Sequence, residues 1–77
     1  MQQKEKYDRR LIQSIQRAED ILSLFMEEKR VLGISDFAQK LSLPKTTIQG
    51  IVNTLVALHY LEKDPLTSKY RLGARLF

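Results

Sequence analysis

The chain has 77 residues, which allows one small domain with a modest buried core. It lacks cysteine, so disulfides and thiolate metal sites are excluded, and its 43% hydrophobic content is ordinary for a folded domain rather than a disordered chain or a fibre. The net charge of +4 favours a polyanionic partner, no apolar run approaches the ~18 residues of a membrane span, and no signal peptide is visible, so we expect a cytoplasmic protein.

Residues 1–13 are polar and basic and allow two interpretations. They can form a frayed terminus. They can also form a helical arm, because Tyr7 and Leu11 continue the apolar stripe of the segment that follows. In that case the arm either extends the first helix or packs on a partner subunit.

The first secure helix is predicted to begin at Ser14, a suitable N-cap, and to end around residues 28–30. Its expected buried stripe consists of Ile15, Ala18, Ile21, Leu22 and Phe25. Lys29 and Arg30 would suit the negative end of the helix dipole. Residues 31–34 form a short apolar link that can pair with a later hairpin.

Residues 35–58 predict two amphipathic helices joined by a tight turn. Ser35 is expected to cap the second helix, which stops at Ser42, and Leu43 is expected to reach the core from the turn. Pro44 should open the third helix, which extends to about Leu58.

The third helix separates apolar from polar side chains by helical spacing. Its expected inner side consists of Ile48, Ile51, Val52, Leu55 and Leu58. Its outer side consists of Thr46, Gln49, Gly50 and Asn53. No acidic residue occurs anywhere in residues 37–61, which is what a helix approaching a polyanion requires.

Residues 60–63 and 69–72 predict two strands around a turn at residues 64–68. Leu61, Tyr70 and Leu72 should point to the core, and Lys69 and Arg71 outward. Helix, turn, helix and hairpin together predict a mainly α domain with a small β-hairpin. This is the winged helix-turn-helix, a three-helix core plus a wing that reads DNA, here over residues 14–77. The apolar pair Leu76 and Phe77 leads us to expect a further domain in the parent protein.

The outer side of the third helix supplies the candidate base readers. Gln49 and Asn53 can form paired hydrogen bonds to adenine, and the methyl groups of Thr46 and Thr47 can contact thymine. Lys45, at the positive end of the helix, suits a phosphate. Gly50 either lets the backbone approach the groove wall closely or marks a lost contact; a glycine here costs ~1 kcal/mol of helix stability.

The hairpin supplies a second group of candidate contacts. Lys63, Lys69 and Arg71 can neutralise phosphates or enter a minor groove, and Thr67 and Ser68 can donate to phosphate oxygens. Alternatively, the charges only protect an edge strand from aggregation. Arg17 on the first helix either contacts a phosphate or pairs with a neighbouring residue.

The sequence offers little support for catalysis. His59 is the only histidine and has no evident serine or carboxylate partner. There is no glycine-rich phosphate loop, and the acidic residues lack metal-ligand spacing. We therefore expect neither an enzyme nor a bound cofactor or metal.

Three segments carry a more specific signal: SIQRAEDILSLF, ISDFAQKLSLPKTTIQGIVNTL and YLEKDPLTSKYRLG. They resemble the DNA-binding domain of the IclR (isocitrate lyase regulator) family of bacterial transcription factors. The resemblance covers residues 14–77 and is most specific at residues 43–47 and 70–73. This chain has Gln49 and Gly50 where the family often has a His-Arg pair, and His59 and Ser68 where it often has glycine.

The resemblance implies a homodimeric repressor or activator that binds pseudo-palindromic promoter DNA. It also implies a small organic effector, bound by a C-terminal domain that this chain lacks. The alternative is a winged helix that contacts another protein and does not bind DNA. The salt dependence of duplex binding distinguishes these two functions, because the affinity of a DNA-binding protein falls steeply as salt concentration rises.

Overall fold

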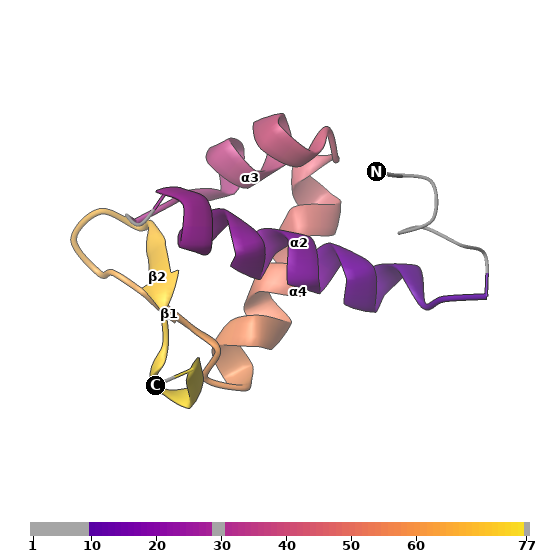
Figure 1. Cartoon of the computed structure of the whole chain (residues 1–77). Coiled ribbons are helices and arrows are strands. Elements are labelled where there is room, and N and C mark those ends of the chain that lie inside the picture. Colours follow the sequence, from indigo (N-terminus) through magenta and orange to yellow (C-terminus); the bar gives the residue numbers. More distant parts are fainter. Residues whose placement is uncertain (1–9, 29–30, 77) are drawn as a thin grey trace.

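The computed structural model describes residues 10–28 and 31–76. Over these ranges it contains the helices α2 (Gln13–Glu28), α3 (Ile34–Leu41) and α4 (Lys45–Ala57), the strands β1 (Leu61–Lys63) and β2 (Tyr70–Leu72), and the short 3-10 helix η1 (Ala74–Leu76). Figure 1 shows α2 lying across α4, α3 beside both, and the hairpin near the C-terminal end of the chain. Three helices followed by an antiparallel hairpin are the predicted winged helix-turn-helix.

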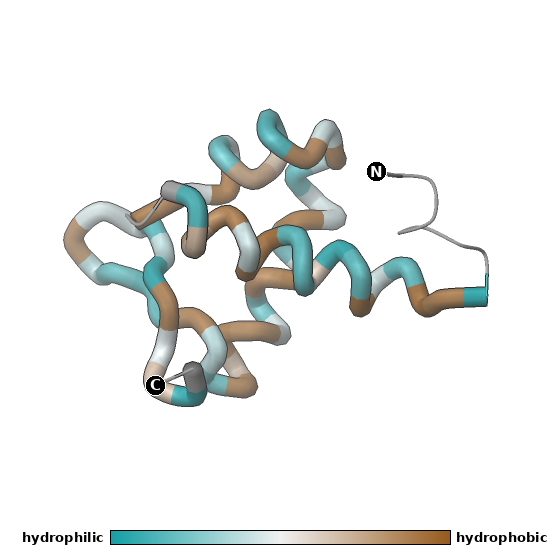
Figure 2. The backbone as a smooth tube through the Cα atoms, viewed as in Figure 1, coloured by the Kyte–Doolittle hydropathy of each residue, from teal (hydrophilic) through white to brown (hydrophobic). Residues whose placement is uncertain are grey.

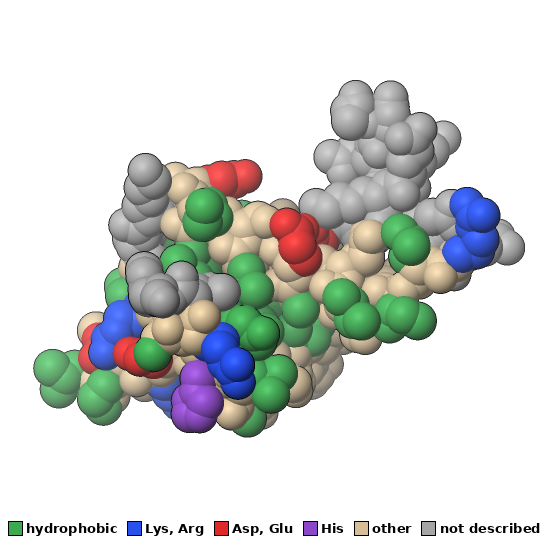
Figure 3. Space-filling model, turned by 60° about the horizontal axis from the view of Figure 1, so that its bottom comes forward, with side chains coloured by type: hydrophobic (Ala, Val, Ile, Leu, Met, Phe, Trp, Pro, Cys, Tyr) green, Lys and Arg blue, Asp and Glu red, His purple; other side chains and the backbone are tan. Residues whose placement is uncertain are grey.

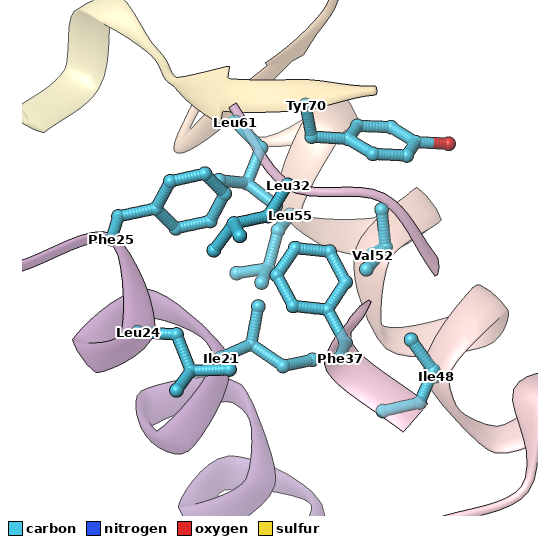
Figure 4. Close-up of a cluster of buried hydrophobic side chains, with 10 residues drawn as sticks. All are labelled: Ile21, Leu24, Phe25, Leu32, Phe37, Ile48, Val52, Leu55, Leu61 and Tyr70. Atoms are coloured by element: carbon cyan, nitrogen blue, oxygen red, sulfur yellow. The ribbon is translucent and has the colours of Figure 1, made fainter. Parts of the chain in front are cut away.

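The helices α2, α3 and α4 and both strands contribute to one hydrophobic core (Figure 4). The buried side chains are Ile21, Leu24, Phe25, Leu32, Phe37, Ile48, Val52, Leu55, Leu61 and Tyr70. The rings of Phe25 and Phe37 pack at a centroid distance of 5.7 Å and join α2 to α3. Figure 2 shows hydrophobic positions recurring along each helix, as amphipathic packing requires.

Helix α2 differs from the prediction at its N-terminal end. It begins at Gln13, so Ser14 is not its N-cap; the carbonyl of Ile12 accepts the amides of Ile15 and Gln16 instead. Ile15 was expected in the core but is 66% exposed, because the first turns of α2 extend past α3 and α4 (Figure 1). Leu24, which the predicted stripe omitted, is buried in its place. Lys29 and Arg30 lie outside the described residues.

Helix α3 begins one residue before the predicted cap. Gly33 is its N-cap, and Ser35 lies inside the helix, so that prediction was wrong. The physical reason is Asp36, whose carboxylate accepts the Gly33 amide at 2.8 Å and so fixes the start of the helix. The preceding link behaves as expected, because Leu32 forms an isolated antiparallel bridge with Tyr70.

The turn between α3 and α4 lies where the sequence predicts it, but the ends of the two helices differ from the prediction by a residue. Leu43 packs against the core and donates its amide to the Ala38 carbonyl at 3.1 Å. Pro44 precedes α4 as its N-cap instead of forming its first residue. Leu58 was expected on the inner side of α4 but is 47% exposed. The helix ends at Ala57, so Leu58 does not continue its buried side.

Within residues 10–28 and 31–76, three non-glycine residues have positive φ: Ser42 at 55°, His59 at 69° and Ser68 at 62°. Ser42 ends α3 in this left-handed conformation. Glycine adopts it at a lower steric cost than any L-residue with a side chain. The positive φ is a physical reason for the glycine that the IclR family often has at the positions of His59 and Ser68.

Gly73 is required by a close approach between two backbone segments. A Cβ at this position would lie 2.5 Å from the carbonyl oxygen of His59 and 3.1 Å from the amide nitrogen of Leu61. The Gly73 amide also donates to the Tyr60 carbonyl at 2.8 Å. The chain after β2 therefore returns against the segment before β1 with no room for a side chain.

We predict that Gly73→Ala lowers the free energy of unfolding by about 1–3 kcal/mol, because the methyl group meets backbone atoms that cannot move independently. Gly50→Ala is the matched control. Nothing lies within 4 Å of a Cβ at Gly50, so alanine should stabilise α4 by about 0.5–1 kcal/mol. Urea unfolding measures both. Equal effects of the same sign would contradict the described packing.

Candidate nucleic-acid interface

The burial of one side of α4 determines which side faces solvent. Ile48, Val52 and Leu55 are buried in the core. On the opposite side Thr46, Gly50 and Asn53 are exposed and Gln49 is partly exposed. The predicted division of this helix is therefore present, and neither candidate amide reader is packed inside the fold.

Gln49 and Asn53 form a hydrogen-bonded pair one helical turn apart. The Gln49 Nε2 group donates to Asn53 Oδ1 at 2.8 Å. This bond leaves the side-chain oxygen of Gln49 free to accept a hydrogen bond and the side-chain amino group of Asn53 free to donate one. If Asn53 donated to Gln49 instead, the pair would still offer one free donor and one free acceptor. Adenine offers a matching donor at N6 and an acceptor at N7 in the major groove.

The beginning of α4 suits a phosphate group. Lys45 and Thr46 are exposed, Thr47 is partly buried, and no acidic residue lies in the first turn. No side chain caps this end, so amides of the first turn remain available to an anion at the positive end of the helix dipole.

The register of the hairpin sends its cations to opposite faces. Lys63 pairs with Tyr70 and Glu62 pairs with Arg71, so alternation puts Lys63 on the core-side face and Arg71 on the outer face. Arg71 Nε lies 3.3 Å from Glu62 Oε1, with both side chains about half exposed. The charge of Arg71 is thus partly balanced within the hairpin.

The turn at the tip of the hairpin is organised by Asp64. Its carboxylate accepts the Thr67 hydroxyl at 2.8 Å and the Leu66 amide at 3.3 Å. The hydroxyl of Thr67 also accepts the Lys69 amide at 3.2 Å. The proton of this hydroxyl therefore points to Asp64 rather than outward, whereas Ser68 and Lys69 are exposed. Contacts of Thr67, Ser68 and Lys69 with DNA stay predictions.

A hollow of about 330 Å³ lies between α4 and the hairpin. We call it the α4–hairpin hollow; its lining residues are Gln49, Asn53, Val56, Ala57, Lys63 and Tyr70. The sequence assigned Tyr70 only to the core, and its ring is indeed buried. In Figure 4 its hydroxyl points away from the rest of the cluster, which the sequence pattern alone did not reveal.

The remaining candidates lie outside this constellation. Arg17 is partly buried on α2, and its contact with a phosphate stays a prediction. His59 is exposed after α4. Within residues 10–28 and 31–76, no helix is long and apolar enough to cross a membrane, and no three His, Cys, Asp or Glu residues form a possible metal site.

The sequence is similar to those of known transcriptional regulators. The sequence model of the IclR helix-turn-helix domain matches residues 14–65. The chain is 39% identical over 66 residues to the HTH-type transcriptional regulator XynR of Escherichia coli, covering 86% of this chain and 26% of that protein. It is 43% identical over 67 residues to the glycerol operon regulatory protein of Streptomyces griseus, covering 87% and 26%.

Solved structures show the same fold. A crystal structure of an IclR family transcriptional regulator from Brucella abortus superposes with a TM-score of 0.81 and 33% identity, covering 90% of this chain and 26% of that one. A transcriptional regulator from Alicyclobacillus acidocaldarius gives a TM-score of 0.83 at 28% identity, covering 87% and 27%. The chain thus spans about a quarter of the length of these relatives.

We predict a measurable effect of the tip contacts on Asp64. The hydroxyl of Thr67, followed by the amide of Leu66, holds the pKa of the Asp64 carboxyl below its ordinary value. Because the folded-state pKa is depressed, the stabilisation is present above the ordinary value and is lost as pH falls through the depressed pKa. In an NMR titration Thr67→Val should raise the Asp64 midpoint, whereas Thr46→Val should leave it unchanged. An unmoved midpoint in Thr67→Val would show that the contact is absent in solution.

Proposed function

The chain belongs to the IclR family of helix-turn-helix transcriptional regulators, and on this basis we propose that it recognises specific sequences in double-stranded DNA. Helix α4 would lie in the major groove, and the hairpin would contact the backbone or the minor groove. The role is one of binding, without catalysis. The observation that carries this proposal is the Gln49–Asn53 amide pair on the outward side of an acid-free helix.

The amide pair supports reading of adenine in particular. A helix in the major groove contacts base edges through its first two or three turns, and Gln49 and Asn53 lie in the second and third turns of α4. Their mutual hydrogen bond restricts both side chains before binding, so less conformational entropy is lost when they meet the base. Lys45 and the free amides at the start of α4 would hold a neighbouring phosphate.

For the whole protein we propose a homodimer on pseudo-palindromic promoter DNA in the cytoplasm, where it represses or activates transcription. Exposed apolar side chains just before α2 and in its first turn support a self-contact there: Leu11 is 47%, Ile12 62% and Ile15 66% exposed. Figure 3 shows hydrophobic side chains on the surface toward this end of the molecule. A small organic effector would bind a domain outside this chain.

Selection of bound duplexes from a random pool tests the function directly. We expect the parent to enrich one sequence that contains adenine, and Gln49→Ala or Asn53→Ala to lose about 1–3 kcal/mol of preference at the same base pair. The double variant should lose less than the sum of the two, because the side chains act as one unit. Gln13→Ala, which removes an exposed amide from α2, is the control.

Three outcomes would count against this proposal. If the parent enriches no sequence and its duplex affinity does not depend on salt, the domain is a protein-contact module instead. If both alanine variants select the parent's sequence, the assigned readers are wrong. If the two losses fall at different base pairs and add fully, the residues do not read as a pair.

We predict that Lys45→Gln weakens binding to all duplexes alike and lowers the slope of log affinity against log salt by about 1, because one phosphate contact is removed. Fluorescence anisotropy over a salt series measures this slope on the selected duplex and on a scrambled one. A loss confined to the selected duplex would assign Lys45 to base reading and not to the backbone.

A further inference from the structure

The α4–hairpin hollow has two chemically different parts. Its apolar part is formed by the side chains of Val56 and Ala57 together with the ring of Tyr70. Its lining residues with polar groups are Gln49, Asn53, Lys63 and Tyr70. A deoxyribose with its phosphate carries both an apolar ring face and an anion at this scale.

Lys63 and Tyr70 face this hollow for a reason built into the hairpin. They are directly opposite each other in the antiparallel register, so their side chains lie on the same face of the sheet. The acidic Glu62 lies on the other face, where it pairs with Arg71 at 3.3 Å. The register therefore directs the lysine into the hollow and turns the neighbouring carboxylate away from it.

The Tyr70 hydroxyl is available for a ligand. The ring is buried in the core, with the whole residue only 4% exposed, yet the residue also lines the open hollow. In Figure 4 the hydroxyl points away from the hydrophobic cluster. A phenol held in one orientation by its packed ring donates a hydrogen bond to an anionic oxygen at little cost in conformational entropy.

We propose that the α4–hairpin hollow binds one sugar–phosphate unit of the DNA backbone, with Lys63 and the Tyr70 hydroxyl contacting the phosphate and Val56 and Ala57 contacting the sugar. This inference rests on the proposed function and adds a positioning site to it. The hollow shares Gln49 and Asn53 with the reading face. A phosphate bound there therefore fixes the distance from the backbone to the base that the amide pair reads.

Ethylation interference tests this proposal at single-phosphate resolution. In the parent chain, ethylation of one particular phosphate near the base read by the amide pair should block binding. In both Tyr70→Phe and Lys63→Gln, binding should become insensitive to ethylation at that same phosphate and stay sensitive at the others. Tyr70→Phe should weaken binding about fivefold to tenfold, and Lys63→Gln should also lower the salt slope by about 1.

Tyr60→Phe is the matched control. It removes a tyrosine hydroxyl from a ring outside the hollow, one that lies 5.9 Å from the Arg75 guanidinium carbon. It should keep the parent's affinity and interference pattern. Thermal unfolding of Tyr70→Phe should match that of the parent, because the ring that fills the core is retained.

The outcomes separate this inference from the proposed function. If the parent binds its selected duplex and both variants keep the parent's interference pattern, the hollow does not hold a phosphate, and the function stands. If the two variants lose sensitivity at different phosphates, Lys63 and Tyr70 do not share a site. If the parent shows no sequence-selective binding at all, the function itself is refuted and the inference with it.

Discussion

Two backbone hydrogen bonds between Leu32 and Tyr70, of 2.9 and 2.7 Å, join the hairpin to the three-helix body. They connect the link before α3 with strand β2 and bring both side chains into the core. A two-stranded hairpin alone is at best marginally stable in water, so this contact and the buried Leu61 and Tyr70 hold it in place. The position of every hairpin side chain relative to α4 depends on this attachment.

Helix α4 shows how the core determines a binding surface. Ile48, Val52 and Leu55 are buried, and the helical period then forces Gln49 and Asn53 outward. The two amides bond to each other and so form one unit with a free donor and a free acceptor. Gly50 beside them has open space at its Cβ position, so no packing in the described structure requires a glycine there.

The charged side chains of the hairpin differ in the face of the sheet on which they lie. Lys63 faces the hollow beside α4, whereas Arg71 pairs with Glu62 on the opposite face. Asp64 holds the tip through Thr67, which leaves the hydroxyl proton of Thr67 engaged inside the turn. Turn stability at the tip and the cation beside α4 thus come from different residues of the hairpin.

The sequence by itself determined the order of the elements, the inner side of α4 as far as Leu55 and the placement of Gln49 and Asn53 on its outer side. These follow from helical and strand periodicity, which depends only on neighbouring residues in the chain. It did not determine where the helices begin. The Asp36 carboxylate accepts the Gly33 amide, so Ser35 is not the N-cap of α3. The Ile12 carbonyl accepts the first amides of α2, so Ser14 is not the N-cap of that helix. The sequence also misplaced Ile15, since burial of a periodic residue depends on how far another element covers it, and within the described residues the side chain of Ile15 stays 66% exposed. Only the tertiary structure brought Lys63 and Tyr70 beside the amide pair, because that juxtaposition depends on strand register and on contacts between segments far apart in the sequence.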